Sequence, residues 1–502
     1  MPRLAVLTVG CSLFLVVGWV MLATHQEKQS NQSGISVTPF QRDRSPLDQA
    51  SALRTPPQLP AGRRDGPRDR NVPLPPAKKK LGSRGVSVDR NNIVETVTME
   101  DLRAPPGRLW LPAALSGPMG LRTEGEPLSS VLVAYCQLDM LSYHQSPWLF
   151  AMGAFHQRHS GCLDDPSLTR TYRLSSLKRL LEEHPDDFMD PSGFIYHETR
   201  CGSTLSANMI AAVPSNIVHS ETPPPVAVLN LCAGPGKCPY GMREELVRTV
   251  FRLMGPKQDG HTNVFFKFQS SMYVAAVEEA WPDTRWIYLF RDPLEVMASN
   301  LKGAWRKQDR DNKLQQQPVT AGRLGNNATA PMYNLGGPCV RAVKPKKTTP
   351  GSRPKLPGPA VLVSVCAKHL ETLNEVVLKQ IQDGSPNGVV VEYRQLPEVM
   401  TEFVYPEWFG MAKTEAGQSS FKRFMEPVTH VYSKGMATPV EGAVSKAGTY
   451  EQGMDLRMKE DGSDDNMRAA AATMCDNYRA LVELQRWRKQ EQGNTMGTCG
   501  AR

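Results

Sequence analysis

The stretch FIYHETRCGSTLSANMI, residues 194–210, runs from an apolar segment through a polar turn into a helical pattern. A turn between a strand and a helix presents backbone N–H groups at the helix N-terminus, where the partial positive charge favours an anion. Gly202 lets the backbone approach an anion closely, while Ser203 and Thr204 offer hydroxyl donors. The same residues also suit an ordinary helix N-cap, so this turn alone leaves both interpretations open.

Short apolar runs alternate with helical patterns beyond this stretch, among them NIVHS (216–220), NVFFKF (263–268), WIYLF (286–290) and PLEVMASNLK (293–302). A run as continuous as WIYLF is typical of a strand buried on both faces. Alternation of such strands with helices indicates crossover units and a parallel sheet. The sequence therefore predicts an α/β domain that is doubly wound around a central parallel sheet.

The N-terminal segment is strongly apolar, since residues 4–24 contain no charged side chain. At about 1.5 Å per residue a helix of this length crosses a hydrocarbon core of about 30 Å. We expect residues 1–24 to form a short cytoplasmic tail and a transmembrane signal anchor. A cleaved signal peptide is the alternative, although its apolar core is usually only about 7–15 residues long. Arg3 marks the cytoplasmic side, which predicts type II orientation.

Composition also divides the rest of the chain. Residues 25–128 are rich in Pro, Arg, Ser and Gln and predict a disordered stem, because such a segment buries too little apolar surface to offset chain entropy. Apolar periodicity then predicts a folded domain over residues 129–490, followed by a tail over 491–502. Within the domain, residues 306–358 lose the pattern and predict a disordered insertion.

The net charge of +9 is unevenly distributed. Residues 61–90 carry a net charge of +6 and residues 306–355 carry +9, so the remainder of the chain sums to −6. Both basic segments are rich in Pro and Gly, which is typical of solvated, flexible chain and not of a folded basic face. The charge pattern therefore gives no support for nucleic-acid binding.

Ten cysteines are present and none forms a CxxC pair, which disfavours a zinc ribbon or a thioredoxin-type motif. In a secretory lumen some of them would form disulfides, and Cys232 and Cys238 are the nearest candidates. Asn31 and Asn327 lie in glycosylation sequons, which agrees with a luminal location.

A second segment, WIYLFRDPLEVMAS (286–299), places Arg291 at the carboxyl end of a predicted strand and Ser299 in the next helix. Pro293 suits the first turn of that helix. The fork of Arg291 can bind a phosphate, and Ser299 can donate to the same group if the helix passes beside it. A surface Arg-Asp turn is the structural alternative.

Together the two segments resemble the sulfotransferases that use 3′-phosphoadenosine-5′-phosphosulfate (PAPS). That family has a basic residue and a short Ser, Gly and Thr run after its first core strand, and an Arg followed by Ser, eight positions later, after another strand. The matching residues are Arg200, Gly202, Ser203, Thr204, Arg291 and Ser299, with Cys201 in place of the common serine. The resemblance covers roughly residues 190–302.

The resemblance implies a P-loop-like three-layer fold in which these residues, Cys201 included, bind the donor. It also implies no metal site, because the family transfers the sulfuryl group without a divalent cation. An ATP-type P-loop has the form G-x-x-x-x-G-K-[ST], and this loop lacks both the first glycine and the lysine. The sequence thus disfavours a nucleoside-triphosphate kinase.

Sulfuryl transfer needs a base near the loop to deprotonate the acceptor. Cytosolic members of the family place a His two residues after a Lys, but FFKFQ supplies Lys267 followed by Gln269, which is no base. Similarity to the tyrosylprotein branch places the catalytic Glu at Glu221, with His219 as the lesser alternative. The resemblance further implies that Arg200 and Lys267 act beside the transferred group.

These observations predict a single-pass type II Golgi membrane enzyme whose luminal domain moves a sulfuryl group from PAPS to a secretory-pathway acceptor. The acceptor hydroxyl is expected on a carbohydrate or on protein tyrosine. Two alternatives remain: a nucleotide-dependent phosphotransferase on the same fold, and a catalytically silent, membrane-tethered nucleotide-binding protein.

Overall fold

The structure is a computed structural model, and the part of it described below lies in one compact unit, residues 78–502. The described residues are 89, 93–117, 128–150, 162, 165–231, 241–301, 339, 359–411, 415–430, 463–487 and 499. The predicted anchor, most of the predicted stem, and the predicted insertion apart from Cys339 lie outside them. Among the described helices, none is both long and apolar enough to cross a membrane.

The larger sheet has five strands and all neighbouring strands are parallel. Its strands are β5 (Pro191–His197), β6 (Asn216–Ser220), β7 (Asn263–Phe268), β8 (Trp286–Phe290) and β9 (Gly388–Glu392). They lie in the order β6-β7-β5-β8-β9. The prediction of an α/β fold with a central parallel sheet is thereby confirmed.

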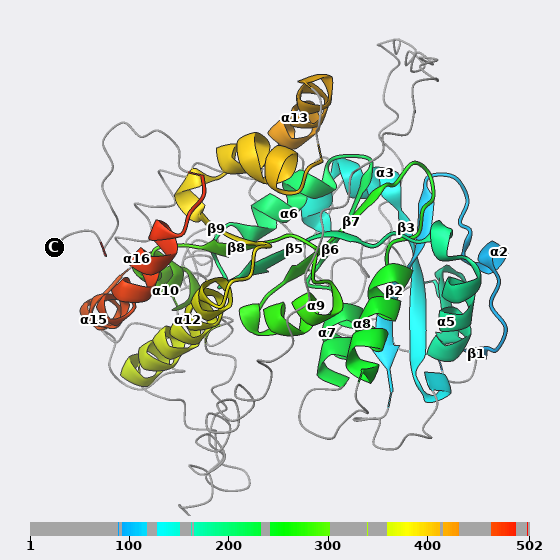
Figure 1. The fold of residues 1–502 in the computed structure, drawn as a ribbon, viewed down its shortest axis with the longest axis horizontal. Coiled ribbons are helices and arrows are strands. Elements are labelled where there is room, and N and C mark those ends of the chain that lie inside the picture. Colours follow the sequence, from blue (N-terminus) through cyan, green and yellow to red (C-terminus); the bar gives the residue numbers. More distant parts are fainter. Residues whose placement is uncertain are drawn as a thin grey trace, which may run out of the picture. The chain divides into compact units, whose positions relative to one another are not determined.

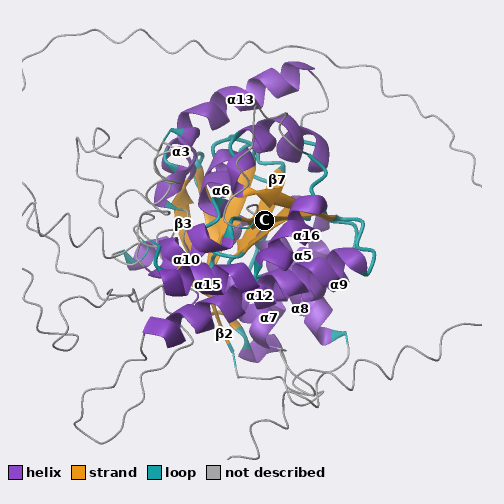
Figure 2. Ribbon diagram, turned by 90° about the vertical axis from the view of Figure 1, so that its left-hand side faces the viewer, coloured by secondary structure: helices purple, strands orange, loops and turns teal. Residues whose placement is uncertain are grey.

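Helices cover both faces of this sheet. Above it in Figure 1 lie α6 (Ser203–Ala211) and α13 (Glu415–Thr429), and the view in Figure 2 agrees. Below it lie α7 (Pro223–Leu231), α8 (Met242–Leu253), α9 (Val274–Ala280) and α12 (Pro359–Gln382). All residues of β8 are fully buried, as expected for a strand covered on both faces.

The other described α-helices and one π-helix complete the fold. They are α2 (Met99–Leu102), α3 (Met140–Gln145), α5 (Leu174–Glu183), α10 (Pro293–Leu301), a π-helix (Met400–Trp408), α15 (Asp465–Thr473) and α16 (Cys475–Glu483). Helix α10 begins at Pro293, as predicted, because proline loses no helical hydrogen bond in the first turn.

A smaller mixed sheet has the order β1-β4-β3-β2. Its strands are β1 (Ile93–Val94), β2 (Arg108–Ser116), β3 (Leu132–Asp139) and β4 (Thr169–Arg173). Strand β2 pairs along its length with β3 and buries Leu109, Trp110 and Leu111. The predicted stem over residues 25–128 is therefore wrong for the segment that contains β1, α2 and β2.

Proline explains why sequence reasoning missed β2. Pro112 interrupts an apolar run, and a proline inside such a run argues against a central strand. The structure accommodates it because β2 is an edge strand and its register shifts between Pro112 and Ala114. An edge position and a bulge are the places where a strand tolerates a missing N–H donor.

The two sheets are linked by Tyr143 of α3. Its hydroxyl accepts a hydrogen bond from the Val218 N–H at 2.8 Å and donates to the Val218 carbonyl at 3.0 Å. Strand β6 lies at the edge of the larger sheet, where backbone groups have no neighbouring strand. Tyr143 therefore satisfies both polar groups of one edge residue that would otherwise be buried without partners.

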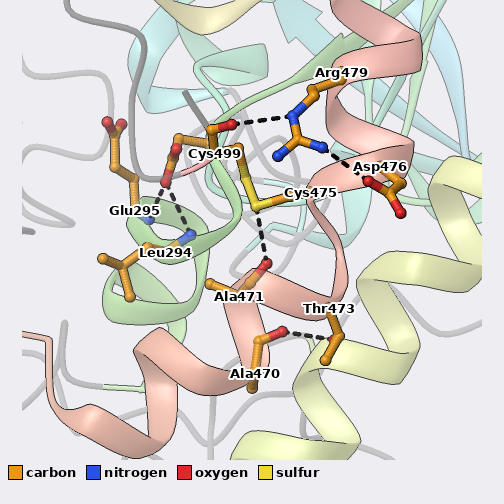
Figure 3. Close-up of a disulfide and its surroundings, with 10 residues drawn as sticks. Leu294, Glu295, Ala470, Ala471, Thr473, Cys475, Asp476, Arg479 and Cys499 are labelled. Carbon is orange, nitrogen blue, oxygen red and sulfur yellow. Dashed lines mark hydrogen bonds and ion pairs between the residues drawn. A yellow bond between two sulfur atoms is a disulfide. The ribbon is translucent and has the colours of Figure 1, made fainter. Parts of the chain in front are cut away.

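Three disulfides join described residues: Cys136–Cys162, Cys339–Cys366 and Cys475–Cys499. The last one ties a residue of the predicted tail to α16, near Leu294 and Glu295 at the start of α10 (Figure 3). The Arg479 Nε donates to the Cys499 carbonyl at 3.1 Å, so this part of the tail packs on the folded domain. The candidate pair Cys232 and Cys238 lies outside the described residues.

Candidate active site

Four of the polar residues singled out in the sequence lie at or just beyond the carboxyl ends of β5, β6, β7 and β8, namely Arg200, Glu221, Lys267 and Arg291. From β5 the chain passes to β6 and β7 on one side, and then crosses to β8 and β9 on the other. In open α/β sheets, ligands bind outside the carboxyl ends of the strands at such a reversal point. The loops after β5 and β8 meet there, and they carry Arg200 and Arg291.

The turn after β5 has an unusual backbone. Thr199, Arg200 and Gly202 all have positive φ angles, of 83°, 56° and 83°. Gly202 is the N-cap of α6 and has no side chain to cap this helix, while Ser203 and Thr204 lie inside its first turn. The hydroxyls therefore do not act as ordinary N-caps, and the N-terminal N–H groups of α6 face the turn as an anion site requires.

Gly202 is required for space as well as for backbone conformation. A Cβ atom at this position would lie 2.5 Å from Leu396 Cδ1 and 2.8 Å from Tyr393 Cδ2. Gly260 has the same φ of 83°, but a Cβ there meets nothing within 4 Å. Comparing the same substitution at the two glycines therefore separates the cost of backbone strain from the cost of a steric clash.

We expect Gly202→Ala to destabilise the protein clearly more than Gly260→Ala. Each substitution places a side chain in the left-handed region at a cost of about 1–2 kcal/mol, and only Gly202→Ala adds a clash that forces Tyr393 or Leu396 to move. Urea unfolding of both variants measures the difference. Equal losses of unfolding free energy would show that the loop adapts to the added methyl group.

Lys267 lies at the centre of the second part of the site. Ser220 pairs with Lys267 in the β6–β7 register, so the next residue, Glu221, lies beside the lysine. Lys267 Nζ donates to Glu221 Oε1 at 2.6 Å and lies 3.4 Å from Ser220 Oγ and 3.5 Å from Thr204 Oγ1. One buried ammonium group thus contacts the proposed base and the helix that follows the turn.

Glu221 is strongly influenced by its neighbours. Burial would raise the pKa of its carboxyl, but the Lys267 ammonium and His197, whose Nε2 lies 3.3 Å from Glu221 Oε1, hold the pKa below its usual range. Thr199 N–H donates to His197 Nδ1 at 3.0 Å, which leaves the ring proton on Nε2, facing the carboxylate. Glu221 also has a positive φ of 55°, a conformation that clusters at functional sites.

Arg291 forms the third part of the site and is nearly fully buried. Its Nε donates to Glu295 Oε2 at 2.5 Å, and its Nη1 donates to the Arg200 carbonyl at 3.5 Å. Its guanidinium carbon lies 3.8 Å from the centroid of the Tyr393 ring. These contacts exclude the alternative of a surface Arg-Asp turn and fix the guanidinium beside the turn after β5.

Glu198, in the turn after β5, contacts the backbone of the loop after β8. Its Oε1 accepts a hydrogen bond from the Arg291 N–H at 2.6 Å. Burial raises the pKa of Glu198 to about 8, so this carboxyl is mostly protonated at neutral pH. Burial also raises the pKa of Cys201 to about 12, which keeps the thiol neutral within the turn.

His219, the lesser candidate for the base, is turned away from this site. It is buried in β6, its Nε2 donates to the Met254 carbonyl at 2.7 Å, and its ring stacks on Phe266 at 5.2 Å. Ser299 lies in α10, two turns beyond Arg291, and is 8% exposed. The structure therefore brings Thr204, Glu221 and Lys267 into contact, and Arg200 and Arg291 into contact.

Several residues near these groups were not singled out in the sequence: His197, Glu198, Glu295, Tyr393 and Arg394. His197 lies at the carboxyl end of β5, and Arg394 lies just beyond that of β9. That position was a usable signal, because the carboxyl ends of all strands in a parallel sheet share one edge. Among the described residues, no group of three or more His, Cys, Asp or Glu side chains is placed to hold a metal ion.

The fold and this geometry define an α/β protein with a cationic, partly buried site at the carboxyl edge of a parallel sheet. No protein-family model and no curated protein matches the chain. Among solved structures, a sulfotransferase from Mycobacterium avium aligns with 12% identity and a TM-score of 0.29. The alignment covers 50% of this chain and 72% of that one. A similarity this weak does not assign a function to this chain.

Proposed function

We propose that this protein is a PAPS-dependent sulfotransferase whose base is Glu221. The observation that carries the proposal is the contact of Lys267 with Glu221 at 2.6 Å and with Thr204 at 3.5 Å, directly beside the turn after β5. A carboxylate base, a buried ammonium group and a helix N-terminus whose N-cap residue is a glycine lie close together. Transfer of an anionic group to a hydroxyl needs these three elements.

The residues present suit a donor with two phosphate-bearing ends. The N–H groups at the start of α6, with Arg200, Ser203 and Thr204, would hold the 5′-phosphosulfate. Arg291, which precedes α10, and Ser299, which lies within α10, would hold the 3′-phosphate. The backbone carbonyl of Arg200 accepts from Arg291, so the two groups of residues adjoin one another.

The proposed reaction is a direct displacement at sulfur. Glu221 takes the proton from the acceptor hydroxyl, and the acceptor oxygen forms a bond to sulfur as the bond from sulfur to the bridging phosphate oxygen breaks. Lys267, Arg200 and the N-terminus of α6 stabilise the negative charge that appears on that phosphate. The products are a sulfate ester and 3′-phosphoadenosine-5′-phosphate.

The contacts of Lys267 suggest how the base becomes available. Paired with Lys267, the Glu221 carboxylate has a lowered pKa and is a weak base. When Lys267 turns toward the departing phosphate oxygen, the pair separates and the basicity of Glu221 rises. Ser220 and Thr204 offer the ammonium group hydroxyl partners within 3.5 Å along the way.

We further propose that the acceptor is a carbohydrate or a protein tyrosine of the secretory pathway, and that the enzyme is a single-pass type II protein of the Golgi membrane. The apolar segment Leu4 to Thr24 supports a membrane anchor. The three disulfides among described residues support an oxidising compartment.

The test is incubation of the purified full chain with PAPS carrying labelled sulfur, against a panel of glycans and tyrosine peptides. Label transferred to an acceptor hydroxyl is the expected result. Transfer of phosphate from a nucleoside triphosphate to the same panel would instead establish the phosphotransferase alternative. Calorimetric binding of 3′-phosphoadenosine-5′-phosphate without turnover of any acceptor would favour the silent nucleotide-binding protein.

A further inference from the structure

Two arginines share one carboxylate at the carboxyl ends of β8 and β9. Arg291 Nε donates to Glu295 Oε2 at 2.5 Å, and Arg394 Nη2 donates to Glu295 Oε1 at 2.7 Å. Glu295 therefore bridges the two guanidinium groups with one oxygen for each. The sequence motif assigns only Arg291 to a phosphate, although Arg394, which lies far away in the sequence, belongs to the same cluster.

Charge balance makes Arg394 important to this cluster. The ion pair of Arg291 with Glu295 has no net charge and gives little attraction to a phosphate dianion. Arg394 adds the positive charge that is needed, unless other carboxylates cancel it. Burial raises the pKa of Glu392 to about 7 and also raises the pKa of Asp292, so both nearby carboxyls are less negative than usual.

Hydrogen bonding agrees with a raised pKa of the carboxyl at these two positions. Asp292 Oδ2 and Glu392 Oε1 are buried and have no hydrogen-bond partner among the described residues. An oxygen in such a place is more costly to bury when ionised than when protonated, which raises the pKa of the carboxyl. The two guanidinium groups share the carboxylate of Glu295, and the raised pKa values of Asp292 and Glu392 leave these groups less neutralised than two fully ionised carboxyls would.

Arg394 is also more accessible than Arg291. Its side chain keeps 20% of its surface exposed, against 3% for that of Arg291. Arg291 is fixed by Glu295, by the Arg200 carbonyl and by the face of Tyr393. A ligand that approaches from solvent would therefore meet Arg394 as well as Arg291.

We propose that Arg394 is a second phosphate-binding residue in the cluster of Arg291, Glu295 and Arg394, and that it determines the preference for a nucleotide with a 3′-phosphate. This inference rests on the proposed function, since it takes the nucleotide to be that of PAPS. A planar guanidinium group can bind two oxygens of one phosphate, and two such groups around one phosphate discriminate strongly against a ligand without it.

The test compares two nucleotides by isothermal titration of the full chain: 3′-phosphoadenosine-5′-phosphate, and adenosine-5′-phosphate, which lacks the 3′-phosphate. We expect the parent to prefer the first, and Arg394→Gln to lower that preference about 10- to 100-fold, the worth of a charged hydrogen bond. Affinity for adenosine-5′-phosphate should change little. Retention of the parental preference, or equal losses for both nucleotides, would overturn the inference.

Arg285→Gln is the matched control. Arg285 precedes β8, at the amino ends of the strands, and donates to the Glu407 carbonyl. Its loss should therefore leave the preference for the 3′-phosphorylated nucleotide unchanged. If Arg394→Gln does not fold, Arg394→Lys decides, since lysine keeps the charge without the planar fork. If Arg394→Lys lowers the preference for the 3′-phosphorylated nucleotide by at least about threefold, the inference is supported, and an unchanged preference overturns it. A parent with no preference at all refutes the proposed function itself, and this inference with it.

Discussion

Glu221→Gln is expected to lower turnover by about 10²–10⁴-fold while affinity for 3′-phosphoadenosine-5′-phosphate stays nearly unchanged. Glutamine keeps the shape of the side chain but cannot accept the acceptor's proton. Glu221 is also the ion-pair partner of Lys267, whose side chain is fully buried, so the variant should lose stability. Single-turnover kinetics, measured well below the variant's unfolding temperature, separate the chemical effect from that loss.

Glu278→Gln is the matched control for this experiment. The Glu278 carboxylate accepts a hydrogen bond from the Trp286 indole N–H at 2.6 Å, at the amino end of β8, far from the proposed base in the fold. It should lower stability without lowering turnover. If Glu221→Gln retains more than about a tenth of parental turnover when chemistry limits the rate, then Glu221 is not the base.

The strands of the larger sheet could be predicted from their sequences because each is a short, continuous apolar run. WIYLF and NVFFKF became β8 and β7 with the bounds that the runs suggested. Their order in the sheet could not be read in this way, since it depends on contacts between distant segments. The β6–β7 register that places Glu221 beside Lys267 is one such contact.

Site residues, too, could be predicted from the sequence only where they form a local pattern. Motif spacing indicated Arg291 because an Arg at a strand end before a helix is a local pattern. Glu295 could have been noticed as its neighbour one helical turn later. Arg394 could not be assigned to the cluster with Arg291 and Glu295 until β9 was known to lie beside β8. Residues that act together from different strands are visible only once the strand order is known.

Lys267→Met is the second substitution with a large expected effect. Methionine fills a similar volume but carries no charge, so the departing phosphate oxygen loses one stabilising group, and turnover should fall by about 10²–10³-fold. Lys178→Met is a suitable control, because Lys178 also pairs with carboxylates, Glu182 and Glu245, but does so on the surface of α5. Its turnover should match that of the parent.

The pH profile of Lys267→Met tests the coupling between the lysine and the base. In the parent, burial acts to raise the pKa of Glu221, and Lys267 is the largest influence that lowers it. Without Lys267 the pKa of Glu221 rises, so protonation of the base begins at higher pH. Since kcat/KM reports ionisations of the free enzyme, its acid limb should move to higher pH in the variant. Acid limbs at the same pH in both proteins would show that Lys267 does not control the charge of Glu221, and the proposed exchange of lysine between base and phosphate would fail.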